Sequence, residues 1–183
     1  MTVSGGDLVW LRGTNGVGKT SLLRMAAGMG RPDAGTVNRM LDGVPASAAA
    51  LTGFQGHKDA VKPSLSVLEN LMFWARLAGA SDLAQTALVK VGLTGRESQR
   101  AGTLSAGQSR RLALAQLYVS RKPLWIMDEP AAAIDSSGQS VIDDLIDEHI
   151  NAGGAVILAS HAAPPAGRGI RFVTLSSPEE AAP

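Results

Sequence analysis

The chain has 183 residues, 45% of them hydrophobic and 18% charged, which is typical of a folded domain and excludes a disordered segment. Seventeen lysine and arginine residues nearly balance sixteen aspartate and glutamate residues, so a broad nucleic-acid-binding face is not expected. Cysteine is absent, which excludes disulfide bonds and thiolate chemistry, and no run of about 18 apolar residues predicts a membrane span. We expect a single domain over residues 1–183, without a signal peptide and working in the cytosol.

Short apolar strands alternate with amphipathic helices along the chain. Because the strands are apolar on both faces, they are typical of buried parallel strands. The pattern predicts an α/β fold around a mainly parallel sheet, with a helical subdomain beside it between about residues 60 and 120. In chain order, the expected elements are a strand at 8–11, helices at 20–27, 66–77, 82–91 and 106–119, a strand at 124–127, a helix at 139–150 and a strand at 155–159.

Three positions carry signals for helix ends. Ser81 and Ser105 are expected to be the N-caps of the helices that follow them, since a serine oxygen accepts hydrogen bonds from the first free amides. The pair Gly153-Gly154 is expected to stop the helix before it.

A glycine-rich segment lies between the first strand and the first helix and fits the pattern G-x-x-x-x-G-K-[ST] at every fixed position. Glycine lets successive main-chain amides converge on phosphate oxygens, and the helix N-terminus adds a partial positive charge. The segment predicts a nucleotide site in which Lys19 binds the β- and γ-phosphates and Thr20 binds Mg²⁺. The residues expected to bind the nucleotide here are Gly13, Thr14, Asn15, Gly16, Val17, Gly18, Lys19, Thr20 and Ser21.

Two acidic residues, Asp128 and Glu129, follow the strand at 124–127. An aspartate at the carboxyl end of a buried strand can bind Mg²⁺, so Asp128 is a candidate metal ligand. Glu129 points elsewhere because strand side chains alternate, and it can activate the attacking water as a general base. The same residues with Pro130 would alone fit a surface turn, and the phosphate-binding segment favours the catalytic interpretation.

Between these two segments, Leu104-Ser105-Ala106-Gly107-Gln108 resembles the signature motif of ABC-type ATPases, with Ala106 where most members have glycine. The stretch 132–135 resembles the loop after the acidic pair, and His161 resembles the family's switch histidine. The resemblance implies a P-loop domain that binds and hydrolyses ATP with Mg²⁺ as a head-to-tail homodimer. It also assigns nucleotide-binding roles across the dimer to Leu104, Ser105, Ala106, Gly107, Gln108 and Asp135.

The segments 56–63 and 66–71 narrow the resemblance to the CcmA subfamily, the ATP-binding subunits of cytochrome c maturation, also called haem exporter ATPases. ABC ATPases generally have glutamine about where His57 lies, whereas CcmA proteins typically have Gly-His. The resemblance implies a peripheral subunit on the cytoplasmic face of the bacterial inner membrane, bound to integral subunits of the CcmB and CcmC type. His57 would then replace the glutamine that senses Mg²⁺ and the attacking water and relays that state to the membrane partner.

The segment 61–73 is the expected contact with the membrane partner. Phe73 and Trp74 are candidate contacts, although aromatic residues on a helix more often belong to the core. Direct haem binding is not expected, because the three histidines are scattered and no C-x-x-C-H is present. His161 is expected to bind the γ-phosphate, and His149, in an acidic helix, is expected to be solvated.

Three other functions stay open. The chain could serve another small transporter, although the Gly-His pair argues against this. It could be a soluble ABC ATPase acting on DNA or ribosomes, although it has no heptad run and only one cassette. It could also bind nucleotide without hydrolysis, an alternative that the intact Lys19, Asp128, Glu129 and His161 disfavour.

The start of the chain departs from the family pattern. ABC domains usually begin with a strand and an adenine-stacking aromatic residue, but only 12 residues precede Gly13, and Trp10 lies in the strand that enters the loop. The family's first strand is therefore expected to be missing. Either the natural protein starts upstream of Met1, or a shortened protein binds ATP weakly. We also expect the sheet to expose unpaired main-chain groups at an edge.

Overall fold

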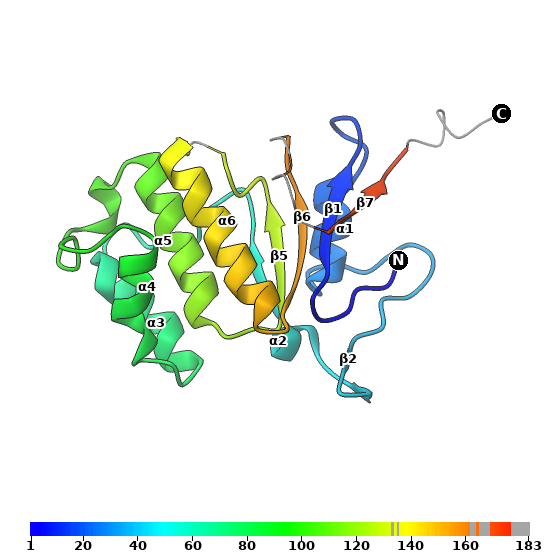
Figure 1. Cartoon of the computed structure of the whole chain (residues 1–183), viewed down its shortest axis with the longest axis horizontal. Helices are drawn as coiled ribbons and strands as arrows, with labels where there is room; N and C mark the ends of the chain where they lie inside the picture. Colours follow the sequence, from blue (N-terminus) through cyan, green and yellow to red (C-terminus); the bar gives the residue numbers. More distant parts are fainter. Residues whose placement is uncertain (133, 135, 162–163, 165–168, 177–183) are drawn as a thin grey trace.

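Five parallel strands form the central sheet, in the order β4-β5-β6-β1-β7. This computed structural model describes residues 1–132, 134, 136–161, 164 and 169–176. The expected α/β fold with a mainly parallel sheet is confirmed (Figure 1). The strands are β1 Leu8–Arg12, β4 Thr52–Gln55, β5 Leu124–Asp128, β6 Ala155–Ala159 and β7 Ile170–Thr174.

Two strands of the sheet, β4 and β7, were not predicted. The β4 sequence is only four residues long, and the β7 sequence IRFVT has no continuous apolar run. The β7 sequence lacks such a run because the strand lies at the sheet edge, where Arg171 and Phe172 are exposed. Because β7 pairs with β1 from Leu8 to Arg12, the strand that leads into the glycine-rich loop has neighbours on both sides, and the exposed edge lies at β7.

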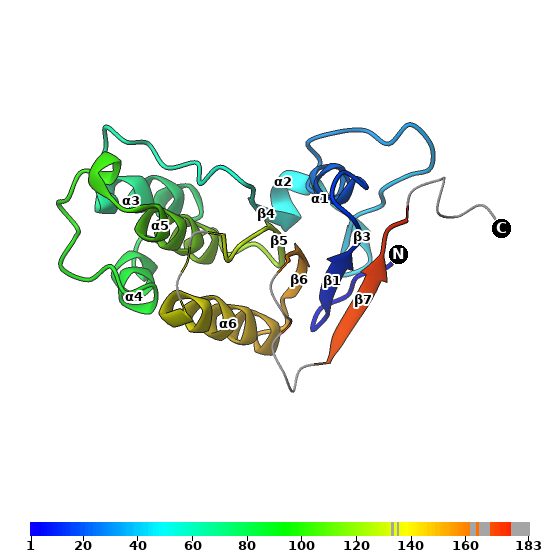
Figure 2. The same cartoon turned by 90° about the horizontal axis from the view of Figure 1, so that it is seen from above.

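Helices cover both faces of the sheet and continue beside it. In Figure 2, α1 lies on one face and α6 on the other, while α3, α4 and α5 form a group next to β4 and β5. This group is the expected helical subdomain. A short antiparallel hairpin, β2 and β3, precedes α2 and was not predicted. The bounds are α1 Lys19–Ala26, β2 Met40–Leu41, β3 Val44–Pro45, α2 Ala48–Leu51, α3 Val67–Leu77, α4 Leu83–Lys90, a 3₁₀ turn Ala101–Thr103, α5 Ala106–Val119 and α6 Ser136–Asn151.

Helix ends follow the serine signals in part. Ser105 caps α5 as expected, and Ser66 caps α3 in the same way, each in a reciprocal capping box. The expectation for Ser81 is wrong: Asp82 is the N-cap of α4, and its side chain makes no capping hydrogen bond. Gly153, with φ +86°, follows the end of α6 as predicted.

The strands contribute to two apolar layers because their side chains alternate. Val9 and Leu11 pack with Leu23 of α1 on one face. Leu8 and Trp10 pack on the other face, with residues of α3 to α6. All four of these β1 side chains are buried, which is why the strand sequence is apolar throughout.

The expectation that His149 is solvated is wrong. Its imidazole stacks on Trp125, with ring centroids 4.0 Å apart and planes 6° apart. Its Nε2 lies 3.2 Å from the carbonyl oxygen of Pro123. Burial lowers the pKa of His149, so the fold favours the neutral ring.

Within the described part of the chain, none of the helices combines the length and the apolar character that a bilayer crossing requires.

Candidate functional site

The glycine-rich loop at residues 13–18 connects β1 to α1 at the carboxyl edge of the sheet. Gly13 and Gly18 have φ angles of +146° and +104°, which favour glycine strongly. A Cβ atom on Gly13 would also lie 2.6 Å from the carbonyl oxygen of Leu175. Gly18 is the N-cap of α1, so the loop wraps onto the positive end of a helix dipole.

The Lys19 ammonium lies over this loop. Its Nζ donates hydrogen bonds to the carbonyl oxygens of Gly13, at 2.8 Å, and Thr14, at 3.1 Å. The first turn of α1 contains no acidic residue that would offset the charge. The loop therefore combines free amides, a helix N-terminus and a full positive charge, a combination suited to phosphate oxygens.

Thr20 and Asp128 are brought together as predicted. The Thr20 hydroxyl donates a 2.8 Å hydrogen bond to Oδ2 of Asp128, which is 6% exposed at the end of β5. A hydroxyl and a carboxylate are oxygen ligands of the kind that Mg²⁺ prefers. No group of three or more histidine, cysteine, aspartate or glutamate side chains in the described ranges could hold a metal alone. A cation here would share its coordination with phosphate and water.

Glu129 has a constrained main chain. Its φ is +52°, a left-handed conformation that costs a residue with a Cβ atom about 1–2 kcal/mol. Its amide donates to the carbonyl oxygen of Ala159, at 2.8 Å. The His161 amide donates to Oε2 of Glu129, at 3.2 Å, and the His161 ring nitrogen Nε2 lies 3.6 Å from Oε1. Glu129 and His161, both predicted as site residues, therefore lie together.

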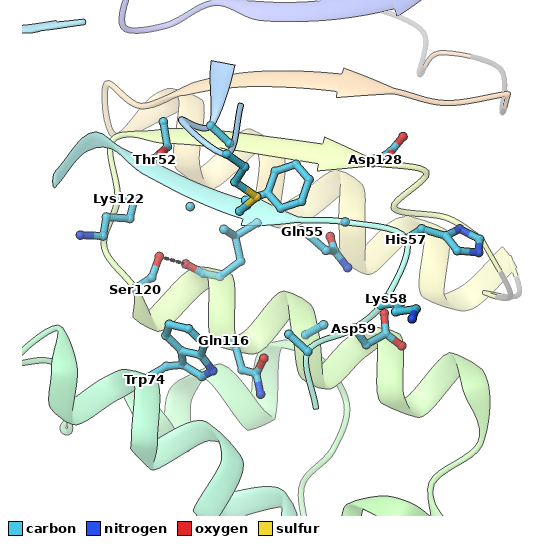
Figure 3. Close-up of a pocket in the computed structure, with 18 of the residues that line it drawn as sticks. Thr52, Gln55, His57, Lys58, Asp59, Trp74, Gln116, Ser120, Lys122 and Asp128 are labelled. Atoms are coloured by element: carbon cyan, nitrogen blue, oxygen red, sulfur yellow. Dashed lines mark hydrogen bonds between the residues drawn. The ribbon is translucent and has the colours of Figure 1, made fainter. Parts of the chain in front are cut away.

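A cavity of about 790 Å³ opens between β4 and the helices α3 and α5. Thr20, Asp128 and Glu129 line one part of it, and His57 lies in its wall in the loop after β4 (Figure 3). Figure 3 shows the exposed His57 between Asp128 and the pair Lys58 and Asp59. In the described ranges the His57 ring makes no hydrogen bond, and its predicted relay role remains a prediction.

The residues of the signature-like segment, 104–108, lie apart from Thr20, Asp128 and Glu129. Ser105 and Gln108 cap the start of α5 through reciprocal hydrogen bonds of 3.2 Å and 3.0 Å. Leu104 packs against the core, and Ser105 and Ala106 are exposed. The cavity lined by Thr20, Asp128 and Glu129 includes none of residues 104–108. Asp135, also predicted to contact nucleotide, lies outside the described residues.

The family profile described as ABC transporter matches residues 1–132 of this chain. The Haemophilus influenzae protein named cytochrome c biogenesis ATP-binding export protein CcmA is 44% identical over 162 residues, covering 85% of this chain and 76% of that protein. The chain belongs to the CcmA family of ABC-type ATPases. The resemblance drawn from the sequence motifs is thereby confirmed, and with it ATP binding.

Solved structures agree with the ABC-type fold. A putative ABC transporter ATP-binding protein from Pyrococcus furiosus superposes with a TM-score of 0.80 at 27% identity, covering 96% of this chain and 87% of that one. The ATP-binding cassette MJ0796, in a dimeric post-hydrolysis state bound to ADP and Pi, gives a TM-score of 0.77 at 21% identity, covering 88% and 78% of the two chains. At that identity the second likeness bears on the fold alone.

Three buried polar side chains lie close to the site and were not predicted from the sequence. Gln55 and Gln116 are 4% and 7% exposed, line the cavity and have amide atoms without a hydrogen-bond partner among the described residues. Arg110 in α5 is 2% exposed. The sequence carried no clear signal for Gln55 or Arg110, because each lies among other polar or small residues and is buried only by the packing of α5 on β4.

The aromatic pair on α3 divides between surface and core. The Phe73 ring is 61% exposed, whereas Trp74 is partly buried, packs against the core and lines the cavity. The two rings meet edge to face, with centroids 5.3 Å apart. Both therefore stay candidate partner contacts, Phe73 on the outer surface and Trp74 inside the cavity.

Proposed function

We propose that this chain is the ATP-hydrolysing subunit of a membrane complex for cytochrome c biogenesis, of the haem export or haem-chaperone release type. The observation that carries the proposal is the 44% identity with a protein named for this process, over 85% of this chain. The Gly56-His57 pair, typical of CcmA proteins, supports the same assignment over another small transporter.

In the proposed site, residues 13–18 and Lys19 hold the nucleotide phosphates, with Ser21 following in α1. Thr20 and Asp128 would hold Mg²⁺, and their 2.8 Å hydrogen bond supports this because it places two hard oxygen ligands side by side. The ion, when bound, neutralises charge that develops on the phosphates.

Glu129 is the proposed general base. Its carboxylate follows the metal-binding Asp128, and its closeness to His161 supports a shared role at the terminal phosphate. Glu129 would accept a proton from the attacking water while His161 orients the phosphate or the carboxylate. His57 is the proposed sensor that reports the state of the site to the membrane partner.

A second copy completes the site in this proposal. The start of α5, where Ser105 and Ala106 are exposed, offers the positive end of a helix dipole, as a phosphate clamp requires. Because residues 104–108 lie outside the cavity that holds Glu129, the clamp of one copy would act on the nucleotide of the other. Asp135 would contribute at the same interface. ATP then joins the two copies, and hydrolysis releases them.

The cavity beside His57 is the proposed docking surface for the membrane partner. Apolar side chains such as Phe54, Trp74 and Leu117 line part of it. Its charged lining is mixed, with three basic and three acidic residues: Arg24, Lys58, Lys122, Asp59, Asp128 and Glu129. An amphipathic segment of an integral subunit of the CcmB or CcmC type fits this lining. The chain would thus sit on the cytoplasmic face of the bacterial inner membrane without crossing it.

The test is genetic and biochemical. Cells that lack the gene should lose cytochromes c with covalently bound haem while keeping b-type cytochromes. The wild-type chain and a Glu148→Gln control, changed on the surface of α6, should restore them, whereas Glu129→Gln should not. Normal cytochrome c levels in the deletion strain would overturn the proposal.

A further inference from the structure

Arg110, near the start of α5, is buried, and both of its terminal nitrogens donate hydrogen bonds. Its Nη1 donates to the carbonyl oxygen of Gly56, at 2.8 Å, and to Oδ1 of Asp59, at 2.7 Å. Its Nη2 donates to the carbonyl oxygens of Glu129, at 2.6 Å, and Asp128, at 3.4 Å. A buried positive charge is tolerated only when it is paired and hydrogen-bonded in this way.

The two nitrogens serve two different parts of the site. Nη1 holds the loop after β4 on both sides of His57, and Nη2 holds the chain where β5 ends. Because a guanidinium is a planar, rigid fork, the positions of its two sets of acceptors are linked. A displacement of the loop at residues 56–59 would therefore change the hold on the main chain of Glu129.

Glu129 needs such a hold because its conformation is not one that the residue prefers. With φ at +52°, the peptide groups on either side must be fixed by neighbours. The carbonyl oxygen of Ala159 fixes the amide, and Arg110 fixes the carbonyl group. The direction of the Glu129 side chain follows from this local main-chain geometry.

We propose that Arg110 is a positioning residue that holds Glu129 in its hydrolytic conformation and ties it to the loop at residues 56–59 through Asp59. The inference rests on the proposed role of Glu129 as general base. Arg110 itself touches no nucleotide in this account, so it acts on the rate of turnover and leaves nucleotide affinity alone.

The experiment compares Arg110→Gln and Arg110→Lys with the parent in the purified full-length chain. We expect kcat for ATP to fall about 10- to 100-fold in Arg110→Gln, as a small misplacement of a reacting group does, with KM and the ATP dissociation constant unchanged. The kcat of Arg110→Lys should lie between those of the parent and Arg110→Gln, because one ammonium cannot serve both sets of acceptors.

Arg171→Gln is the matched control. Arg171 also donates to a carboxylate, that of Asp7 at 2.9 Å, and to a carbonyl oxygen, that of Thr2 at 2.5 Å, but it lies in β7 away from Glu129. Its kcat should equal that of the parent. If the Arg110 variants do not fold, Asp59→Ala decides, since it removes one acceptor and leaves the arginine in place. It should lower kcat about 2- to 30-fold, and an unchanged kcat would overturn the proposal.

A combined variant separates positioning from general damage. In a Glu129→Gln background, Arg110→Gln should cause no further loss of turnover, because the group that it positions is gone. A lower turnover in the double variant than in Glu129→Gln would overturn the proposal. So would a loss of ATP affinity in Arg110→Gln as large as its loss of kcat. If Glu129→Gln alone keeps the parent rate, the role of Glu129 fails instead. If Glu129→Gln is inactive and Arg110→Gln keeps the parent kcat, only the inference about Arg110 fails.

Discussion

Glu129 is held at once by three parts of the fold. The end of β6 accepts its amide hydrogen, α5 donates to its carbonyl oxygen through Arg110, and His161 donates to its carboxylate. A strained main chain supported from several sides is a frequent arrangement for a reacting group, because the support preserves one orientation. The proposed chemistry therefore depends on the groups that hold the Glu129 main chain as much as on its carboxylate.

Replacing Glu129 by glutamine should separate binding from turnover. The amide keeps the shape of the side chain but cannot accept a proton, so ATP binding should persist while turnover falls about 10²- to 10⁴-fold. Equilibrium ATP binding and phosphate release, measured on the same material, check both expectations. Glu148→Gln, on the surface beside Lys90, is the control for the substitution itself. A parental turnover rate in Glu129→Gln would exclude Glu129 as the base.

Lys19→Ala should act on binding instead. The Lys19 ammonium lies over the loop within hydrogen-bond distance of two loop carbonyls, in reach of a bound phosphate. Losing a charge-assisted hydrogen bond should weaken ATP binding about 10- to 100-fold. Lys90→Ala, which removes a surface ammonium paired with Glu148, is the control. Equal dissociation constants for Lys19→Ala and the parent would contradict a phosphate-binding role.

At the scale of elements, the sequence predicted those strands and helices that have a continuous apolar run or a clear N-cap residue. The buried strands β1, β5 and β6 and the capped helix α5 lie where their apolar runs and Ser105 indicated. The site residues Thr20 and Asp128 were predicted because motif and strand context agreed. By contrast, β7 was missed because an edge strand has no need for apolar residues on both faces. Ser81 fails as a cap because the Ala84 amide donates to its main-chain oxygen and Asp82 is already helical.

Arg110 shows why part of the site escaped the sequence. Its role depends on Gly56 and Asp59, 54 and 51 residues away, and on Glu129, 19 residues away. No spacing rule within one element links these positions, because the contact arises only when α5 packs against β4 in the folded chain. Gln55 is similar: only the packing of α5 on β4 makes its burial evident.

The contact between α6 and β5 should make stability depend on pH. Burial against Trp125 lowers the pKa of His149 in the folded state, whereas a histidine in an unfolded chain has a pKa of about 6.5. Below that pH the unfolded state binds more protons, so the free energy of unfolding should fall as the pH drops below about 6.5.

His149→Phe tests this dependence, because phenylalanine keeps a ring that can stack on Trp125 but does not titrate. Urea unfolding at pH 7.5 and at pH 5.5 should show a smaller loss of unfolding free energy in the variant than in the parent. An equal loss in the two proteins would mean that His149 does not contribute to acid sensitivity.

At the scale of the whole molecule, the chain presents two separated features for which we propose phosphate binding. One is the loop at residues 13–18 with Lys19, at the carboxyl edge of the sheet, and the other is the start of α5 at Ser105, within the helical group. Two copies in head-to-tail arrangement would bring each loop against the partner's helix start, with a two-fold axis between the sites. Hydrolysis would then control how the copies, and the membrane subunits bound to them, move.

Mixing two inactive variants tests this completion of the site most directly. Lys19→Ala disables the loop, and Ser105→Arg puts bulk and charge at the helix start, so each variant alone should have little ATPase activity. A mixed dimer would still contain one intact site, formed by the loop of the Ser105→Arg chain and the helix start of the Lys19→Ala chain. An equal mixture should therefore recover activity up to about a quarter of the parent rate, since half of the dimers are mixed and each has one of two sites. A mixture that stays inactive although differently tagged variants co-purify would contradict the account, and so would full activity of Ser105→Arg alone.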